Sequence, residues 1–221
     1  MTWDPVWEKI FREQAWGQYP PEEFIRFIAK NFYQAPNRRN IKLLEVGCGP
    51  GANLWYLARE GFSVYGIEGS QTAVERANMR LNKECPGWAG EIRSGDIRQL
   101  PFEDGFFDAV VDIEAICCND YETAKQIYAE MARVTKKGGK LFSKTFAVGT
   151  WGDGTGKNFG RGAWLVAEGL MVGKGLTRFT SIEEICDLVS NFKISAIELK
   201  TYTVDNRKHT IREWLIYGDK L

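Results

Sequence analysis

The sequence is short of histidine, of paired cysteines and of net charge, and each shortage removes a class of function. His209 is the single histidine, and the five cysteines include no CxxC pair, so the ligand clusters of a structural zinc site are missing. The 29 basic residues balance the 29 acidic ones. This balance gives no support to a nucleic-acid or membrane partner attracted by bulk charge. We therefore expect no metal, no nucleic acid and no membrane partner.

Long apolar runs are also missing, since none approaches the ~18 residues that a membrane span needs. The start, MTWDPVWEKIF, carries Asp4 and Glu8 where a signal peptide would be basic and then apolar. Scattered cysteines in odd number are typical of a reducing compartment. We expect a cytoplasmic protein, either a monomer or a homodimer. The adjacent Cys117 and Cys118 fit the end of a buried strand or, alternatively, a reactive thiol or soft-metal site.

The 221 residues and ordinary globular composition suit one α/β domain with a sizeable core. Apolar spacing predicts helices over 5–13 and 21–33, within an N-terminal helical lid segment at 1–40. From residue 41 to 221, strands and helices alternate. The expected strands are 41–46, 62–67, 89–94, 107–113, 140–148, 193–204 and 210–218. The expected helices are 52–60, 71–84, 121–135 and about 182–190, the last opened by a capping box at Ser181 and Glu184.

This alternation predicts a Rossmann-like, doubly wound sheet of seven strands with helices on both faces. The sheet is expected to be mostly parallel, with an antiparallel last strand because the chain ends in a hairpin. The strand at 89–94 is expected at an edge. Between the fifth strand and the last helix, the glycine-rich stretch 149–179 is expected as one long loop.

A glycine-rich turn, LLEVGCGPGANL, lies between the first expected strand and its helix. Gly47, Gly49 and Gly51 allow a sharp turn and the close approach of a ligand to the backbone. The helix that follows offers free N–H groups and a positive dipole end. Glu68 ends the next strand, where an acid can accept hydrogen bonds from ribose hydroxyls, although a solvated acid is the alternative. Asp96 follows the third strand, where a carboxylate can accept a hydrogen bond from an adenine amino group.

These motifs together resemble those of the class I S-adenosylmethionine-dependent methyltransferases. EVGCGPG, IEGS and GDI are similar to the three cofactor-binding segments of the family, and FDAVVDIEAI and RVTKKGGKLF to its fourth and fifth strands. The resemblance implies S-adenosylmethionine as cofactor. It assigns the following residues to cofactor binding, the last two through a lid: Gly47, Cys48, Gly49, Gly51, Glu68, Gly69, Asp96, Ile97, Asp112, Ile113, Trp16 and Tyr19.

The acceptor site is predicted from topology, because the stretch after the fifth strand and the final hairpin both open on the cofactor edge. The expected acceptor contacts are Trp151, Asp153, Tyr202, Arg207 and Asp120. His209, Asp112 and Glu114 are the candidate catalytic residues. His209 is a candidate base because its unperturbed pKa lies near ~6.5, although it fits equally well as a turn residue.

The predicted function is in-line transfer of a methyl group to oxygen, nitrogen or sulfur of a small molecule. The two chain ends, WEKIFREQAWGQYPPEEF and NRKHTIREW, resemble methyltransferases of surface-glycan pathways, so a sugar or nucleotide sugar is one expected acceptor. Alternatives are an NAD-type oxidoreductase, which Pro50 and the GDI segment disfavour, and a non-catalytic protein that binds the cofactor. Arsenic or tellurium methylation is raised by Cys117 and Cys118, but no third cysteine lies close by. No NPPY-like motif of nucleic-acid methyltransferases follows the fourth strand.

Overall fold

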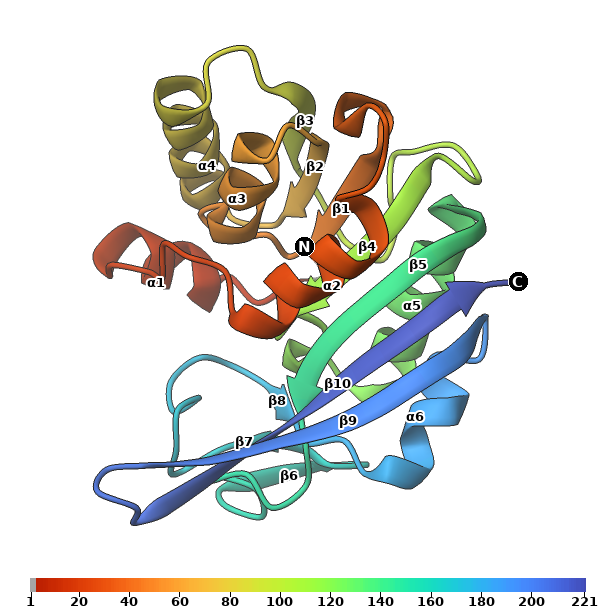
Figure 1. Cartoon of the computed structure of the whole chain (residues 1–221). Coiled ribbons are helices and arrows are strands. Elements are labelled where there is room, and N and C mark those ends of the chain that lie inside the picture. Colours follow the sequence, from red (N-terminus) through yellow and green to blue (C-terminus); the bar gives the residue numbers. More distant parts are fainter. Residues whose placement is uncertain (1–2) are drawn as a thin grey trace.

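A twisted sheet of seven strands runs through the whole molecule, with helices on both of its faces (Figure 1). The computed structural model describes residues 3–221. The strand order is β3-β2-β1-β4-β5-β10-β9. The strands of this sheet are β1 (Lys42–Val46), β2 (Ser63–Glu68), β3 (Ala89–Ser94), β4 (Phe107–Ile113), β5 (Thr135–Phe146), β9 (Phe192–Val204) and β10 (His209–Lys220).

The pairing confirms the predicted sheet. β1 pairs in parallel with β2 and β4, and the parallel pairs β2–β3 and β4–β5 extend the sheet on either side. β10 runs antiparallel to both β5 and β9. β3 lies at one edge, as expected. The carboxyl ends of β1, β2, β3 and β4 therefore meet at one edge of the sheet, where open α/β sheets bind their ligands.

Two layers of helices cover the sheet. Apolar residues of α2 (Glu22–Phe32), α3 (Ala52–Arg59) and α4 (Gln71–Glu84) pack on one face, with Phe24, Leu54 and Leu81 fully buried. The other face carries α5 (Tyr121–Val134) and α6 (Ile182–Leu188). Helix α1 (Val6–Glu13) packs beside α4 and belongs to neither layer (Figure 1). Two short 3₁₀ turns, η1 (Arg38–Asn40) and η2 (Ile116–Cys118), complete the helical elements.

Polar side chains begin the helices that follow the sheet's edge. The Oγ of Ser70 accepts a hydrogen bond from Ala73 N at 3.1 Å to cap α4, and Asp120 accepts one from Thr123 N at 2.8 Å to cap α5. The predicted capping box of α6 is present between Ser181 and Glu184. These caps place the helix starts close to the positions that the sequence predicts.

The fifth strand begins earlier than predicted, at Thr135 rather than Lys140. Phe107 of β4 pairs with Thr135, and after an irregularity Ala109 pairs with Lys140. Gly138, with a φ of +75°, lies inside this irregularity. The glycines therefore interrupt the strand instead of preceding it, since they allow its backbone to bend and continue.

The prediction of one long loop over 149–179 is wrong. This stretch forms a small antiparallel sheet of β6 (Lys157–Gly160), β7 (Ala163–Leu165) and β8 (Thr177–Arg178). Gly162, with a φ of +74°, turns the chain between β6 and β7. Strands this short carry too little apolar alternation to be detected among many turn residues.

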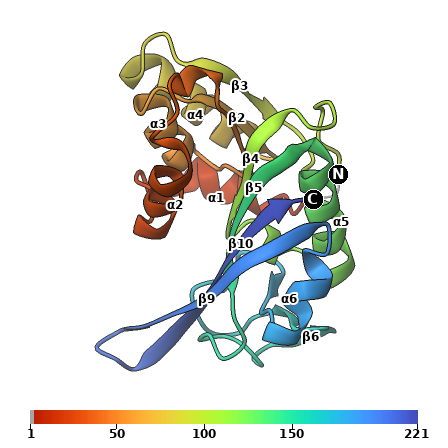
Figure 2. The ribbon, with the colours of Figure 1, turned by 45° about the vertical axis from the view of Figure 1, so that its right-hand side comes forward.

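The last two strands form a long hairpin that projects beyond the rest of the sheet (Figures 1 and 2). β9 and β10 remain paired as far as Val204 and His209, several residues past the point where β10 leaves β5 at Glu213. The turn residues Asp205, Asn206 and Arg207 all have positive φ. The tip is thus carried away from the edge at which the parallel strands end.

Among residues 3–221, no helix is long and apolar enough to cross a bilayer. Within the same residues, no three His, Cys, Asp or Glu side chains gather as a metal site would require.

Candidate active site

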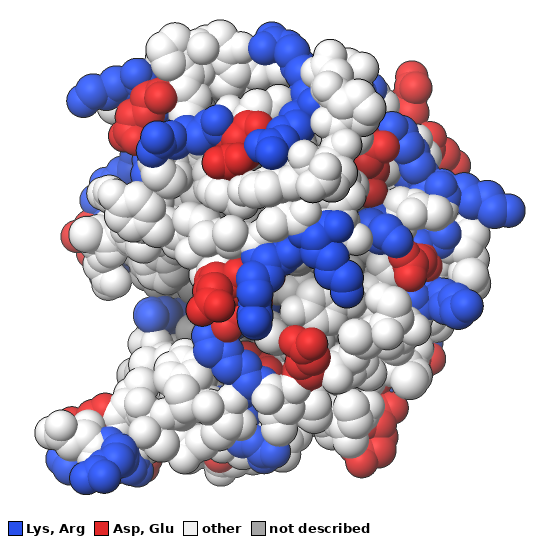
Figure 3. Space-filling view, in the orientation of Figure 1, with Lys and Arg blue, Asp and Glu red and all other residues white. Residues whose placement is uncertain are grey.

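A cavity of about 460 Å³ lies at the carboxyl ends of the parallel strands and is covered on one side by α1. Figure 3 shows the surface hollowed on this side, between α1 and the hairpin tip. Strand-end residues form one half of the cavity. They are Glu45, Gly47, Cys48, Gly49, Pro50, Asn53, Glu68, Gly69, Asp96, Ile97, Ile113 and Glu114. Eight of the ten predicted cofactor-binding positions at strand ends and turns are therefore among the lining residues, and Trp16 and Tyr19 line it as well.

The glycine turn after β1 contributes Gly47 and Gly49 to the cavity wall. Gly47 and Gly49 have φ values of +65° and +50°, which favour glycine. A Cβ atom on Gly47 would overlap the Cβ of Ala115. The N–H of Gly47 donates to Ile67 O at 2.7 Å, which ties the turn to β2. Gly51 does not line the cavity; it precedes α3 with a φ of +79°, and a Cβ there would lie 2.8 Å from Ala77 Cβ.

Glu68 connects the glycine turn to the start of α4. One of its carboxylate oxygens accepts from Gly49 N at 2.9 Å and the other from Ser70 N at 2.9 Å. The side chain is buried, and burial raises its pKa although these backbone hydrogen bonds oppose the rise. Glu68 is therefore held in a fixed position at the cavity wall, where it can accept further hydrogen bonds.

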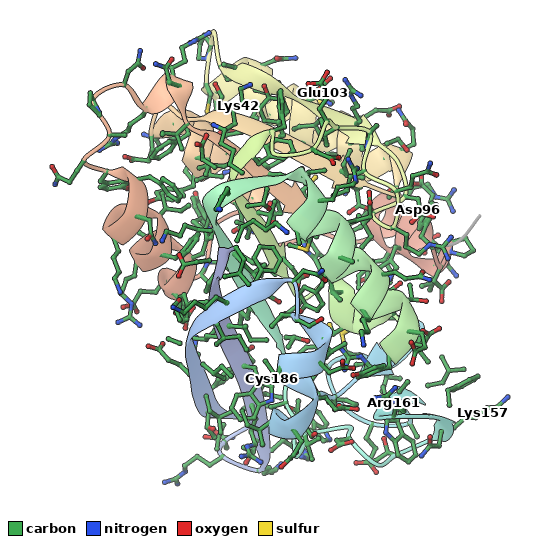
Figure 4. The ribbon with its side chains drawn as sticks, turned by 90° about the vertical axis from the view of Figure 1, so that its right-hand side faces the viewer. Lys42, Asp96, Glu103, Lys157, Arg161 and Cys186 are labelled. Atoms are coloured by element: carbon green, nitrogen blue, oxygen red, sulfur yellow. The ribbon has the colours of Figure 1, made fainter. Side chains whose placement is uncertain are left out.

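Asp96 and Ile97 lie where the chain leaves β3, and Figure 4 shows Asp96 on the α1 side of the molecule. The carboxylate of Asp96 accepts from Arg98 N at 2.9 Å and pairs with the guanidinium of Arg98 at 3.0 Å. The structure thus brings Gly47, Glu68 and Asp96 to one cavity, as the sequence predicted from three separate motifs.

Glu45 and Asn53 line the same half of the cavity and were missed by sequence reasoning. Asn53 Nδ2 donates to Glu45 Oε1 at 2.5 Å. Burial raises the pKa of Glu45 to about 8, although the hydrogen bond from Asn53 opposes the rise. An acidic residue next to the apolar pair Leu43 and Leu44, shortly before a glycine turn, was the available signal.

Asp112 was predicted as a catalytic and cofactor-binding residue, but it does not line the cavity. Its side chain is fully buried and accepts from the backbone N–H groups of Ala115 and Ile116, each at 3.0 Å. Ser143 Oγ donates to its second oxygen at 2.7 Å. Asp112 therefore holds the turn after β4, and Glu114 in that turn is the residue that reaches the cavity.

Aromatic side chains from the N-terminal segment form the opposite half of the cavity. Trp3, Trp7 and Phe11 line it at intervals of four residues, and Trp16 and Tyr19 follow. Phe11 and Trp16 pack edge to face at 5.2 Å between ring centroids, as do Tyr19 and Trp55 at 5.4 Å. The four-residue spacing of these large rings, two of them on α1, was a readable signal for this wall.

A second group of apolar residues faces this aromatic wall from the far part of the chain. Phe146 at the end of β5 and Leu170 and Met171 after β7 line the cavity. Lys174, which also lines it, is the one Lys or Arg among the described lining residues. Sequence reasoning placed no residue of 170–174 in the site, because contacts between segments this distant leave no local pattern.

Glu8 attaches α1 to the rest of the domain. Its carboxylate accepts from Ser70 Oγ at 2.5 Å and from the hydroxyl of Thr72, both at the start of α4. These side-chain hydrogen bonds lower the pKa of Glu8. The same turn that binds Glu68 through Ser70 N therefore also binds α1.

Cys118 lines the cavity, whereas Cys117 is fully buried beneath it. The neighbouring Cys118 thiol, together with burial, raises the pKa of Cys117 well above its usual value. Cys117 is therefore held as a neutral thiol, which favours the prediction of small apolar residues after a buried strand over that of a reactive thiolate.

Trp151 and His209 were predicted as acceptor and catalytic residues, but they do not line the cavity. Their rings stack on each other at 3.8 Å and 7°. The pairing of β9 with β10 extends past the end of β5, so His209 begins its strand out along the projecting hairpin. Stacking on Trp151 satisfies the ring there, as the turn-residue alternative expects.

The remaining predicted acceptor contacts also lie outside the cavity. Asp120 caps α5, and Asp153 accepts from Gly149 N at 2.9 Å within its own turn. Arg207 is exposed at the hairpin tip. Tyr202 donates to Glu213 Oε1 at 3.0 Å on the neighbouring strand. These residues were placed in the site because their segments were expected at the same edge of the sheet as the cofactor. The hairpin extends past that edge, so its residues lie away from the cavity.

Comparison with known proteins decides between the nucleotide-binding families that share a glycine turn. Residues 44–143 match the model of the methyltransferase domain, and this range runs from β1 through most of β5. The sheet with its antiparallel β10 inserted beside β5 is the arrangement of the same family. The matched domain and the fold together support a class I S-adenosylmethionine-dependent methyltransferase. The NAD-type alternative thereby loses its support.

The chain is also similar to sterol methyltransferases over part of their length. The sterol 24-C-methyltransferase ERG6A of Gibberella zeae is 35% identical over 153 residues, which cover 63% of this chain and 38% of that protein. The chain spans about two fifths of the length of the sterol methyltransferases that it matches. Among solved structures, a methyltransferase of Methanosarcina mazei aligns with a TM-score of 0.66 at 22% identity, covering 83% of this chain and 93% of that one.

A geranyl diphosphate C-methyltransferase of Streptomyces coelicolor covers 100% of both chains, with a TM-score of 0.68 at 15% identity. At such identities, the structural likeness concerns the fold. The family's cofactor is S-adenosylmethionine, and the residues present fit it. Gly47 and Gly49 place backbone with positive φ in the cavity wall, and Glu68 is a buried acceptor beside them.

Proposed function

We propose that the chain transfers the methyl group of S-adenosylmethionine to an apolar small molecule bound against α1. The observation that carries this proposal is the division of one cavity into two unlike halves. The strand-end half presents glycine backbone and the acids Glu68 and Asp96, whereas the other half presents aromatic and aliphatic side chains. Each half suits one of the two substrates that methyl transfer must bring together.

The composition of the second half favours an apolar acceptor over the sugar expected from the chain ends. A sugar needs several hydrogen-bonding partners, but the described residues of this half are mainly Trp, Phe, Leu and Met. Its polar members are Asp4, Tyr19, Asn119 and Lys174. Sterol 24-C-methyltransferases and a geranyl diphosphate methyltransferase are among the similar proteins. An isoprenoid or a flat polycyclic molecule fits the apolar lining of the cavity and resembles the substrates in the names of these similar proteins.

We extend the proposal to the N-terminal segment 1–40 as a lid on the domain at 41–221. α1 covers the cavity and is joined to α4 by hydrogen bonds from Ser70 and Thr72 to Glu8. Side-chain hydrogen bonds from Arg76 to the carbonyls of Arg12 and Gln14 hold its far end. Because only a few side-chain hydrogen bonds hold α1 to α4, the segment can open to admit ligands and then close to exclude water.

The chemistry asks the protein mainly for alignment. S-adenosylmethionine, when bound, supplies a methyl group already activated by its sulfonium charge. The strand-end half would hold its nucleoside, with Glu68 accepting from the ribose and Ile97 packing on the adenine. The aromatic wall would then orient the acceptor toward the methyl carbon at roughly 3 Å. Glu114, at the junction of the two halves, is the candidate to take up a proton.

Two measurements test the proposal. Thermal unfolding with S-adenosylhomocysteine at about 100 times its dissociation constant should raise the melting temperature by roughly 5–10 °C, and NADH should not. Radiolabelled methyl transfer should then be measured to a sterol with an unsaturated side chain, to geranyl diphosphate and to UDP-glucose. We expect label in at least one apolar probe. Label in UDP-glucose alone would contradict an apolar acceptor, and cofactor binding without any transfer would favour a non-catalytic protein.

A further inference from the structure

Three charged side chains from three neighbouring strands meet beside the cavity. Nζ of Lys144 on β5 lies 3.0 Å from Glu114 Oε1 and 3.1 Å from Glu213 Oε1. Lys144 is 8% exposed and Glu213, on β10, is 2% exposed. Glu114 follows β4 and lines the cavity. One ammonium group is thus shared by two carboxylates, of which one is in the cavity wall.

The backbone holds Glu114 in this position. Its φ of +60° lies in the left-handed region, which residues other than glycine rarely adopt. Its N–H donates to Lys144 O at 2.8 Å, and its carbonyl accepts from Cys117 Sγ at 3.2 Å. Strained residues held by their surroundings in this way are concentrated at functional sites.

The charges around Glu114 favour a carboxyl group that exchanges its proton near neutral pH. Burial raises the pKa of Glu114 to about 7, while Lys144 opposes the rise and Glu213 adds to it. Burial alone would lower the pKa of Lys144, but the two carboxylates outweigh it and the pKa is raised. Lys144 therefore keeps its charge while the carboxyl pair gains and loses a proton.

Other ionisable groups surround this cluster from each packed element. They are Tyr202 of β9, which donates to Glu213; Cys117 and Cys118 of η2; Asp112 of β4; and Glu23 of α2, which pairs with Lys200 of β9. Among residues 3–221, Lys144 is the one cation within ion-pair distance of Glu114. The state of Glu114 therefore depends chiefly on Lys144 and Glu213.

Building on the proposed function, we infer that Glu114 takes up the proton of the methyl acceptor and that Lys144 and Glu213 are the positioning residues of its carboxylate. An electron pair of the acceptor atom forms the new bond to the methyl carbon. The carbon–sulfur bond breaks with its electrons going to sulfur, and the acceptor's proton passes to a carboxylate oxygen of Glu114. Because this step needs the ionised form of Glu114, the rate falls as the pH drops below its pKa.

A second ion pair on the same two strands provides a matched control. Lys140 of β5 and Asp219 of β10 form an ion pair in the same antiparallel ladder, and Lys140 precedes Lys144 by four residues on β5. Neither lines the cavity. Lys140→Met therefore removes a cross-strand ion pair of the same type without changing the charges beside Glu114.

The first experiment needs no acceptor. Protein labelled with ¹³C at the glutamate side-chain carboxyls is titrated by NMR, and Glu114→Gln identifies the resonance of Glu114. We expect this resonance to titrate near neutral pH, to shift to lower pH in Glu213→Gln, and to shift to higher pH in Lys144→Met. Lys140→Met should leave it unchanged. A resonance that titrates in the ordinary range of glutamate, or that ignores Glu213→Gln, would overturn the inference.

The second experiment uses whichever apolar probe accepts label from the wild-type protein. Glu114→Gln should lose about 100-fold or more of kcat and keep the thermal shift with S-adenosylhomocysteine. Glu213→Gln should move the acidic limb of the kcat/KM profile to lower pH, and Lys144→Met to higher pH. Equal loss at every pH would indicate a merely structural role. If no probe accepts label, the proposed function fails, whereas the NMR titration still decides the proton site.

Discussion

The two halves of the cavity are built in opposite ways. The strand-end half comes from short segments that each follow a parallel strand, and its polar atoms are held by backbone hydrogen bonds such as those of Glu68. The aromatic half comes from residues 3–19 and 146–174, which meet only in the folded chain. The strand-end half suits a cofactor that stays the same across a family, and the aromatic half suits an acceptor that varies.

This comparison predicts that changes in the strand-end half act on the cofactor and that changes in the aromatic half act on the acceptor. The largest effect is expected for Gly47→Ala. Its Cβ would overlap Ala115 and its φ of +65° would be strained. Together these effects should weaken S-adenosylhomocysteine binding by about 100-fold or more. Isothermal titration calorimetry measures the loss directly.

Gly61→Ala is the matched control for this change. Gly61 also has a positive φ, +86°, but nothing lies within 4 Å of an added Cβ. We expect a stability loss on the order of 1 kcal/mol from backbone strain and an unchanged affinity for the cofactor. If both variants bind S-adenosylhomocysteine equally well, the glycine turn is not the cofactor cradle.

A smaller loss is expected for Glu68→Gln. The amide nitrogen of a glutamine would face one of the two backbone N–H groups, of Gly49 or Ser70, that Glu68 now binds. Because the variant loses both the charge and this fixed position, the hydrogen bonds that Glu68 offers to the ribose should weaken, and cofactor affinity should fall roughly 10- to 100-fold. Glu60→Gln, which alters a surface pair with Arg38, is the control. Unchanged cofactor affinity in Glu68→Gln would contradict the role of this acid.

The fold could be predicted closely because its signals are local. The strand at 107–113 and the helix at 71–84 have the predicted bounds, since apolar runs and end residues such as Ser70 define them within a few positions. The three short strands of 149–179 could not be predicted, because β8 has only two residues and glycine turns surround it. In such a stretch, tertiary contacts rather than local periodicity decide the structure.

In the candidate site, too, the residues with local signals could be predicted and the others could not. Gly47, Glu68 and Asp96 were predicted to lie together because each follows a parallel strand, and such ends meet in any sheet of this type. His209 was misplaced because the length of the hairpin, rather than its edge, determines where its tip lies. Met171 had no local signal at all. The spacing of Trp3, Trp7 and Phe11 did offer one, since it repeats every four residues.

The buried acid Glu45 in the strand-end half is expected to lower the free energy of unfolding at neutral and basic pH. Burial raises the pKa of Glu45 from its unfolded value of 4.5 to about 8, with Asp112 and Glu68 adding to the rise. Between these values the folded chain holds a proton that the unfolded chain has released, so stability is lost as the pH rises from about 4.5 to about 8. Glu45→Gln cannot ionise and should escape this loss, by on the order of 1–3 kcal/mol at pH 8.

Urea denaturation of the wild type and of Glu45→Gln at pH 5.5, 7 and 8.5 checks this. The difference between the two proteins should grow with pH, because the other titrating groups largely cancel in it. Parallel stability curves would show that Glu45 titrates in its ordinary range.

The smallest effect is expected in the aromatic half, from Leu170→Ala. Leu170 lines the cavity, whereas Val172 in the same turn does not, and both are exposed, at 40% and 49%. Shortening Leu170 removes apolar contact with an acceptor at about 0.8 kcal/mol for each buried CH₂, so KM for the apolar probe should rise about 3- to 10-fold. Cofactor affinity should stay the same, and Val172→Ala should change neither quantity. Glu68→Gln is expected to lower cofactor affinity, and Leu170→Ala is expected to raise KM for the acceptor. If both variants change the affinity for the same ligand equally, the cavity is one site and not two.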